Sequence, residues 1–319
     1  MDVSAALTSL LSAPVLAFAL GLIAVAVRSD LRLPDALTQG LSIYLLLAIG
    51  LKGGVALRGT DAQELVVPLI LAVVIGLVTP LIVYAVLRVL TPLGGVDRGA
   101  VAAHYGSTSL VTFTAAIVAL ETAAIAVPGY AATVLTVMEI PGILVGLLLG
   151  RRHASVRGGW GATVHEIVTG KSILLLVGGL GIGAVIGETG YASVEPLFGD
   201  LFRGALVLFL LALGIEAAQR FGALRHGAVG LIVFAVIFPL TVGSATVLLG
   251  TAAGLGVGGA AILGVLAASA SYIAAPAAVR MALPEAILAY PLTASLGVTF
   301  PVNLGVGIPL FIWIATAVG

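Results

Sequence analysis

The sequence predicts an all-α polytopic membrane protein with ten transmembrane helices, arranged as two inverted five-helix repeats. Of the 319 residues, 61% are hydrophobic and only 9% are charged, whereas a soluble domain carries about 25% charged residues. Apolar runs of the length needed to cross a hydrocarbon core of about 30 Å follow one another along the chain. In addition, the two halves of the chain resemble each other.

Charged residues and clusters of proline and glycine separate the apolar runs, and so define each expected span in turn. The stretch "MDVSAALTSLLSAP" lacks the basic segment of a secretory leader, so the first run is expected to be a span and not a cleaved signal. The sixth and seventh spans are short for helices that cross a membrane. In chain order, the expected spans are 14–28, 36–52, 65–88, 98–118, 130–150, 171–187, 203–217, 228–250, 260–280 and 290–316.

Lysine and arginine are unevenly distributed between the two sides that these spans define. If the segment 151–170 is a short cytoplasmic connector, three basic residues lie outside, namely Lys52, Arg58 and Arg203. The positive-inside rule then predicts an inner (plasma) membrane protein with both termini outside. The eleven basic residues on the cytoplasmic side are Arg28, Arg32, Arg88, Arg98, Arg151, Arg152, Arg157, Lys171, Arg220, Arg225 and Arg280.

Composition also excludes several classes of function. The formal net charge is zero, with 14 basic and 14 acidic residues, which argues against a nucleic-acid partner. The chain has no cysteine, so it has no disulfide and no thiolate metal site. A phosphate-binding G-x-x-x-x-G-K-[ST] loop is missing, which argues against ATP-driven transport by this chain alone. No cofactor is expected.

Three pairs of segments carry the internal repeat. "LLLAIGLKGGVALRG" (45–59) is similar to "LFLLALGIEAAQRFG" (208–222), and "VMEIPGILVGL" (137–147) to "VTFPVNLGVGI" (298–308). "GSTSLVTFTAA" (106–116) corresponds to "ASASYIAAPAA" (268–278). Because each half holds an odd number of spans, the second copy is inverted relative to the first, as in many secondary transporters. The first repeat is expected at 1–150 and the second at 171–319.

Hydroxyl side chains gather at matching places in the two repeats, and these segments are the candidate substrate site. In the fourth span they follow a glycine, and in the ninth they precede Pro276. If both helices unwind there, free N–H groups at the half-helix N-termini suit a small anion, and freed carbonyls suit sodium. A packing role between helices is the alternative. The candidate residues are Gly106, Ser107, Thr108, Ser109, Ser269, Ala270, Ser271 and Tyr272.

Ionisable groups at membrane depth are candidates for ion coupling. Glu139 lies in the middle of the fifth span, and is expected to be an ion ligand, a proton carrier or half of a buried pair. The matching part of the tenth span offers the neutral Thr299 and Asn303, and His104 is a candidate proton relay. Lys52 and Glu216 occupy matching span ends, where they either pair or extend toward water, and Glu121 is expected on an outer loop.

Four segments resemble the sodium-dependent bicarbonate transporter family first recognised in cyanobacteria, and they follow the family's order over nearly the whole chain. They are "GSTSLVTFTAAIVALE" (106–121), "VMEIPGILV" (137–145), "LFRGALVLFLLALGIEAAQRFGAL" (201–224) and "GIPLFIWIA" (307–315). The resemblance implies broken, crossing helices 4 and 9. It also implies a core domain of spans 3–5 and 8–10, and a gate domain of spans 1–2 and 6–7. Family members form homotrimers, take up bicarbonate with sodium, and can be regulated by a PII-like protein.

The chain also departs from the family pattern. The ninth span of the family reads like S-S-S-D-I-S-G-P-P, whereas here Ala270 replaces a serine and Tyr272 replaces the acid. Lys52 stands where the family has a smaller polar residue, and the short connector at 151–170 argues against a PII-like regulator. Sodium, if it binds, is expected near Ser107, Ser269 and Ser271.

The resulting hypothesis is an elevator-type secondary transporter, a symporter that takes up a small anion, most simply bicarbonate, with sodium, in the lipid bilayer. A proton-coupled or sodium-independent carrier of another small carboxylate remains open, as does a passive channel or sensor. An intramembrane enzyme would need His104 and Ser107, which are three residues apart on one helix face, to act as base and nucleophile. No third group of such a site is evident, so an enzyme is not expected.

Overall fold

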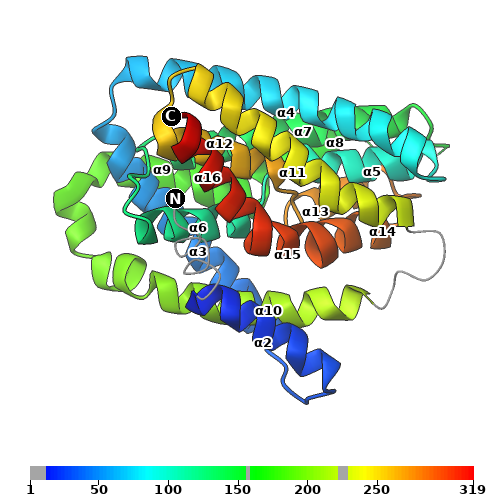
Figure 1. Cartoon of the computed structure of the whole chain (residues 1–319), viewed down its shortest axis with the longest axis horizontal. Helices are drawn as coiled ribbons and strands as arrows, with labels where there is room; N and C mark the ends of the chain where they lie inside the picture. The colour runs from blue at the N-terminus through cyan, green and yellow to red at the C-terminus, as the bar shows by residue number, and fades with distance from the viewer. Residues whose placement is uncertain (1–11, 156–158, 222–228) are drawn as a thin grey trace.

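The computed structural model describes residues 12–155, 159–221 and 229–319, and within these ranges it contains helices and no strands (Figure 1). The predicted non-cleaved N-terminus before residue 12 and the basic residues Arg157 and Arg225 lie outside the described residues. The first half holds α2 (Ala13–Ala26), α3 (Asp35–Arg58), α4 (Ala62–Leu90), α5 (Gly95–Tyr105), α6 (Leu110–Thr122), α7 (Ala131–Arg151) and α8 (Trp160–Thr169). The second holds α9 (Lys171–Ala192), η1 (Pro196–Asp200), α10 (Phe202–Phe221), α11 (Val229–Ala252), α12 (Gly256–Ala268), α13 (Ala275–Ala282), α14 (Ala289–Leu292), η2 (Thr293–Thr299), α15 (Phe300–Val302), η3 (Asn303–Gly307) and α16 (Ile308–Val318).

Eight helical runs in the described residues are long and apolar enough to cross a membrane. Six of them are α3, α4, α7, α9, α11 and the run of α5 with α6. The other two are Pro196–Gln219 and Ala289–Val318. The expected first and ninth spans correspond to α2 and α12, which are apolar but have 14 and 13 residues and fall short of that length.

The sixth and seventh spans are longer than the sequence predicts. The predicted end of the sixth span is a real kink, because Gly187 has φ 61° and ψ −167°, which only glycine adopts readily. The helix nevertheless resumes and continues to Ala192, giving 22 residues. The seventh span gains length at its start, where the single π-helical turn η1 precedes α10. The prediction ended the sixth span before Glu188 and began the seventh at Arg203, two charged residues that the helices tolerate near their ends.

Four helices, α2, α3, α9 and α10, form a unit that we call the scaffold group. Within it, α2 lies against α10 along the lower edge of Figure 1, and α3 lies against α9. Both pairs approach at glycines: a methyl group on Gly54 would lie 2.1 Å from the Leu180 carbonyl oxygen, and one on Gly21 2.4 Å from the Leu211 oxygen. Such backbone contact is the usual way in which membrane helices gain packing energy without a hydrophobic driving force.

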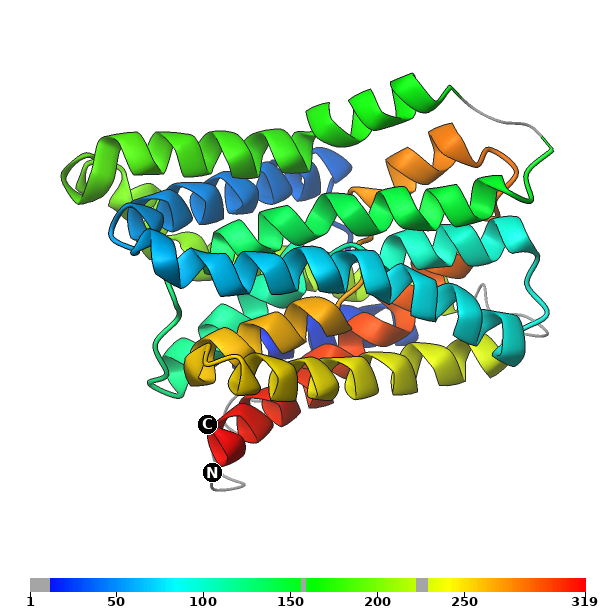
Figure 2. The ribbon, with the colours of Figure 1, turned by 90° about the horizontal axis from the view of Figure 1, so that it is seen from above.

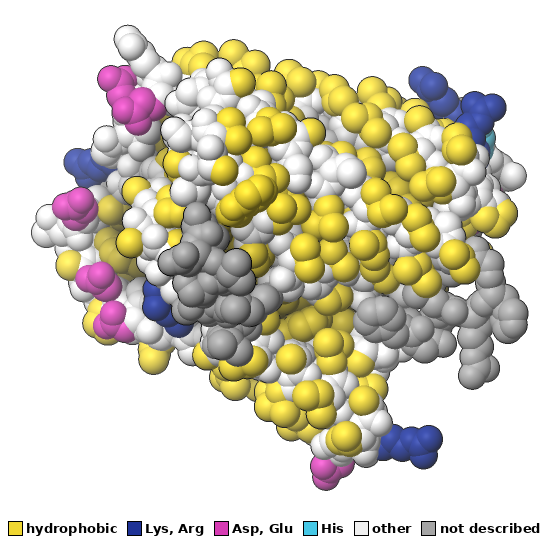
Figure 3. Space-filling model, viewed as in Figure 1, with side chains coloured by type: hydrophobic (Ala, Val, Ile, Leu, Met, Phe, Trp, Pro, Cys, Tyr) yellow, Lys and Arg dark blue, Asp and Glu magenta, His cyan; other side chains and the backbone are white. Residues whose placement is uncertain are grey.

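The remaining spans form a second unit, which we call the crossing group. Here α4, α5 and α7 pack together, as do α11, α12 and α16, and the two sets meet through α12 and α6 (Figure 2). On the face shown in Figure 3, apolar side chains cover the middle, whereas charged side chains gather toward the ends. This distribution suits a protein whose long axis crosses a bilayer.

Candidate functional site

Two spans are interrupted at the hydroxyl-rich segments. The helix α5 ends at Tyr105 and α6 begins at Leu110, so residues 106–109 lie between them. In the same way α12 ends at Ala268 and α13 begins at Ala275. The predicted unwinding at both places is therefore confirmed.

Hydrogen bonds between the two interruptions satisfy the backbone groups that the breaks set free. The Ser109 N–H donates to Ser269 Oγ at 2.9 Å, and the Ser271 N–H donates to the His104 carbonyl at 2.8 Å. The side-chain amide of Asn303 donates to the Ala268 carbonyl, also at 2.8 Å. Unpaired backbone groups cost several kcal/mol in hydrocarbon, so these contacts allow two irregular segments to lie side by side in the membrane.

We call the place where the two interruptions meet the crossing, and one serine caps each of the two helices that start there. Ser109 Oγ accepts a hydrogen bond from the Thr112 N–H at 3.2 Å, at the start of α6. Ser271 Oγ accepts from the N–H groups of Ala274 and Ala275 at 3.3 Å, at the start of α13. The positive ends of two helix dipoles therefore meet at this place, which favours a negatively charged ligand.

Gly106 has a packing role, because it lies against Gly142 of α7. A methyl group on Gly142 would lie 1.7 Å from the carbonyl oxygen of Gly106, so neither position has room for a side chain. Pro141 immediately precedes this contact inside α7. The break in the fourth span is thus held directly against the backbone of the fifth.

A small cavity lies at the crossing and brings half of the predicted polar residues together. Its volume is about 10 Å³, which is close to the least that holds one water molecule. The predicted residues that line it are Thr108, Ser109, Ser271, Tyr272 and Glu139, and the other lining residues are Leu46, Leu110, Leu135, Ser172, Leu176 and Ile273. The cavity is too small for a polyatomic anion, so binding one requires its walls to separate.

Glu139 lies where this cavity meets a larger one. Its carboxylate is buried in α7 and forms no hydrogen bond or ion pair with any described residue. The adjoining cavity has a volume of about 270 Å³ and shares Glu139, Ser172 and Ile273 with the first. Glu166 and Lys171 also line it, so the crossing has an approach from the end of the molecule where α8 joins α9.

Tyr272 closes one side of the crossing cavity. Ser109 Oγ donates a hydrogen bond to the Tyr272 hydroxyl at 3.2 Å, and the ring meets Phe300 edge to face with centroids 5.7 Å apart. The hydroxyl thus links the two broken spans, while the ring packs on the tenth span.

Replacing Tyr272 by phenylalanine should separate these two contributions. Tyr272→Phe keeps the ring contact and removes one hydroxyl from the cavity, so we expect thermal stability within about 1 kcal/mol of the parent protein and a several-fold weaker affinity for a small anion. Binding of a labelled anion to the purified protein measures the effect, and Tyr290→Phe, which lies outside the cavity lining, is the control. An unchanged affinity would show that the phenol does not face the ligand.

Other predicted residues lie beside the crossing but do not line its cavity. His104 Nδ1 is 2.8 Å from the Ala100 carbonyl oxygen, and its Nε2, like Ser107 Oγ and Asn303 Oδ1, is buried without a partner among the described residues. The His104 and Ser107 side chains therefore do not form the hydrogen bond that a base and nucleophile would need. Thr299 Oγ1 is bonded to the Ala235 carbonyl and the Tyr105 hydroxyl. Ala270 is buried, and Ser269 is bonded to Ser109.

The scaffold group contributes residues that sequence reasoning missed. Leu46 of α3 and Ser172 and Leu176 of α9 form the wall that faces the two serine caps. Ser172 offered a weak signal, since it is a hydroxyl that directly follows Lys171 at the start of an apolar span. The two leucines offered none. The cavity therefore lies between the two helix groups.

A buried polar crossing of two interrupted helices, set between two helix groups in an apolar shell, is the arrangement of a membrane transporter. The family model of the Na+-dependent bicarbonate transporter superfamily matches residues 13–316, and the chain belongs to that superfamily. No curated protein matches the chain. Among the described residues no group of three or more His, Asp or Glu side chains could hold a metal ion.

Proposed function

We propose that the protein is a secondary active transporter that takes up a small anion, bicarbonate, together with sodium. The observation that carries this proposal is the meeting of two serine-capped helix N-termini at a buried cavity. N–H groups and hydroxyls there would bind the anion, and Thr108, Ser109, Ser271 and Tyr272 would contact it. Sodium would bind close by, near Ser107, Ser269 and Ser271, with Glu139 assisting the coupling.

The helix contacts support an inverted repeat. The repeat matches α2 to α9 and α3 to α10, so the α2–α10 contact has the α9–α3 contact as its counterpart. Both contacts are made at glycines of the two helices, Gly21 against Gly214 in one and Gly183 against Gly54 in the other. The set of α4, α5 and α7 likewise corresponds to the set of α11, α12 and α16. We propose on this basis that ten spans form two inverted five-helix repeats.

An elevator motion of the crossing group against the scaffold group would complete the cycle. The crossing cavity, at about 10 Å³, is too small for the anion, and one of its walls belongs to the scaffold group. If that wall slid past the crossing, the site would open first to one side of the membrane and then to the other. The α8–α9 end, where the larger cavity begins, would then be cytoplasmic and both termini outside; a homotrimer is the proposed assembly, without a PII-like regulator.

Uptake of labelled bicarbonate into proteoliposomes tests the proposal. We expect uptake to saturate with bicarbonate and to rise at least several-fold when a sodium gradient is imposed. The double variant Ser109→Ala, Ser271→Ala should lower uptake by at least ten-fold, and Ser193→Ala, at the exposed end of α9, should leave it unchanged. Full uptake by the double variant would contradict the site.

Proton coupling is the second candidate, and the unpartnered carboxylate of Glu139 favours it. A buried carboxyl group open to two cavities can carry a proton across the membrane. Uptake that depends on a pH gradient and not on sodium would select this mechanism. Ohmic current without saturation would instead indicate a channel.

A further inference from the structure

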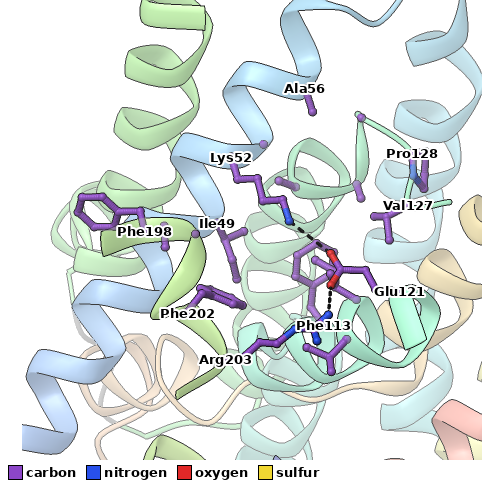
Figure 4. A pocket seen from close by; sticks show the side chains of 18 of the residues that line it. Ile49, Lys52, Ala56, Phe113, Glu121, Val127, Pro128, Phe198, Phe202 and Arg203 are labelled. Atoms are coloured by element: carbon purple, nitrogen blue, oxygen red, sulfur yellow. Dashed lines mark hydrogen bonds and ion pairs between the residues drawn. The ribbon is translucent and has the colours of Figure 1, made fainter. Parts of the chain in front are cut away.

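A second and much larger cavity lies about one helical turn from the crossing cavity along α3, α6 and α7. Its volume is about 540 Å³, and it opens between α3 and α10 on one side and α6 and α7 on the other (Figure 4). We call it the Lys52–Arg203 cavity. None of its lining residues lines the crossing cavity, so the two are distinct places in the molecule.

Three charged side chains meet at this cavity. Glu121 accepts hydrogen bonds from Lys52 Nζ at 3.3 Å and from Arg203 Nη2 at 2.9 Å (Figure 4). Glu121 lies in the last turn of α6 and pairs with both cations, so the expectation of a loop residue was wrong. Lys52 pairs with Glu121 across the two helix groups, a partner that the repeat pattern did not indicate.

The two cations keep further donors available. An ammonium group has three N–H donors and a guanidinium group five, whereas each donates once to Glu121. Their side chains are 67% and 62% exposed. The remaining charged residue in the lining, Asp200, forms no ion pair with either cation. An added carboxylate can therefore bind Lys52 and Arg203 without removing Glu121, although it would face the like charge of Glu121.

The rest of the wall is mostly apolar. Ile49, Phe113, Phe198 and Phe202 line the cavity beside the charged group (Figure 4). Pockets of about 300–1,000 Å³ with apolar walls and a few convergent polar groups bind organic molecules of drug size. Bicarbonate has no apolar part and is far smaller than this cavity.

We propose that the Lys52–Arg203 cavity is a binding site for an amphipathic organic monoanion, namely a carboxylate carried on an aryl or alkyl body. The carboxylate would contact Lys52 and Arg203, and the body would pack against the aromatic wall. A ligand bound there touches α3 and α10 as well as α6 and α7, so it would hold the two helix groups together. It would therefore inhibit a transport cycle in which these groups move.

Binding of 4-phenylbutyrate to the full chain in nanodiscs, measured by calorimetry against empty nanodiscs, tests the proposal. We expect saturable one-to-one binding that is at least ten-fold tighter than that of 4-phenylbutanol, which lacks the charge, or of acetate, which lacks the body. The double variant Lys52→Gln, Arg203→Gln should weaken binding at least ten-fold. Arg58→Gln is the matched control, because Arg58 lies on the same helix but outside the cavity.

The variant Glu121→Gln should change the affinity for 4-phenylbutyrate in the opposite direction. Removing the like charge while keeping an acceptor should tighten 4-phenylbutyrate binding several-fold, and thermal unfolding of each variant shows whether it has folded. Equal binding of the alcohol and the acid, or weaker binding by a folded Glu121→Gln variant, would overturn the proposal. Because the measurement involves no transport, its outcome is independent of the bicarbonate uptake experiment.

Discussion

Gly142→Ala is expected to abolish anion uptake and to lower the thermal stability of the protein more than any other single methyl group added to the fifth span. The added methyl would lie 1.7 Å from the Gly106 carbonyl oxygen, and 2.1 Å from its carbonyl carbon. Overpacking a core costs about 1–3 kcal/mol and occasionally more. Here the obstructing atoms are backbone, so they cannot rotate away, and the displaced segment carries the serines of the crossing.

Gly178→Ala is the matched control for this experiment. Gly178 lies within a membrane helix, α9, but no atom outside its own helix backbone is found within 4 Å of the added methyl. Alanine favours the helix over glycine by about 1 kcal/mol, so this variant should be equal to the parent protein or slightly more stable. Thermal unfolding in detergent and uptake in proteoliposomes measure both effects. A stable, active Gly142→Ala variant would show that the crossing does not depend on this contact.

Glu139→Gln is expected to uncouple transport from its driving ion. Gradient-driven accumulation of the anion should fall at least ten-fold, because glutamine keeps the shape of the side chain but cannot carry the charge or the proton. Exchange of labelled for unlabelled anion needs no net ion movement, and should be retained.

Glu188→Gln serves as the control, since Glu188 is an exposed carboxylate near the end of α9. It should change neither accumulation nor exchange. Loss of exchange as well as accumulation in Glu139→Gln would instead place Glu139 among the anion-binding groups. If Glu139→Gln accumulated the anion as well as the parent protein does, Glu139 would be neither a coupling residue nor an anion-binding residue.

The sequence was sufficient to predict where the two spans break. Hydroxyls next to a glycine in one repeat and before Pro276 in the other are local signals, and helix termination is largely a local property. The repeat strengthened the prediction, because it placed the two signals at matching positions. The role of Gly106 could not be predicted, because a glycine at a helix break can either make the backbone flexible or allow close packing. Only its contact with Gly142 distinguishes these two roles.

Contacts between helices that are far apart along the chain could not be predicted from the sequence. Glu121 pairs with Lys52 and Arg203 from two other helices, and the choice among possible charged partners depends on how the helices pack. That Ser172 lines the crossing cavity likewise depends on how the helices pack. Thr299 and Asn303 were predicted as ion-coupling residues of the tenth span. Their side chains are hydrogen-bonded to the carbonyls of Ala235 and Ala268, a detail that spacing along a helix cannot give.

The hydrogen bonds between Ser109 and Ser269 and between Ser271 and His104 have a consequence for biogenesis. Each joins residues about 160 positions apart, so the first interruption enters the bilayer before its partners have been synthesised. At about 5–20 residues per second, this wait lasts on the order of 10–30 s. During that time the N–H of Ser109 lacks its native acceptor. The N-terminal half alone should therefore be a substrate for membrane quality-control proteases, and co-expression of the C-terminal half should protect it.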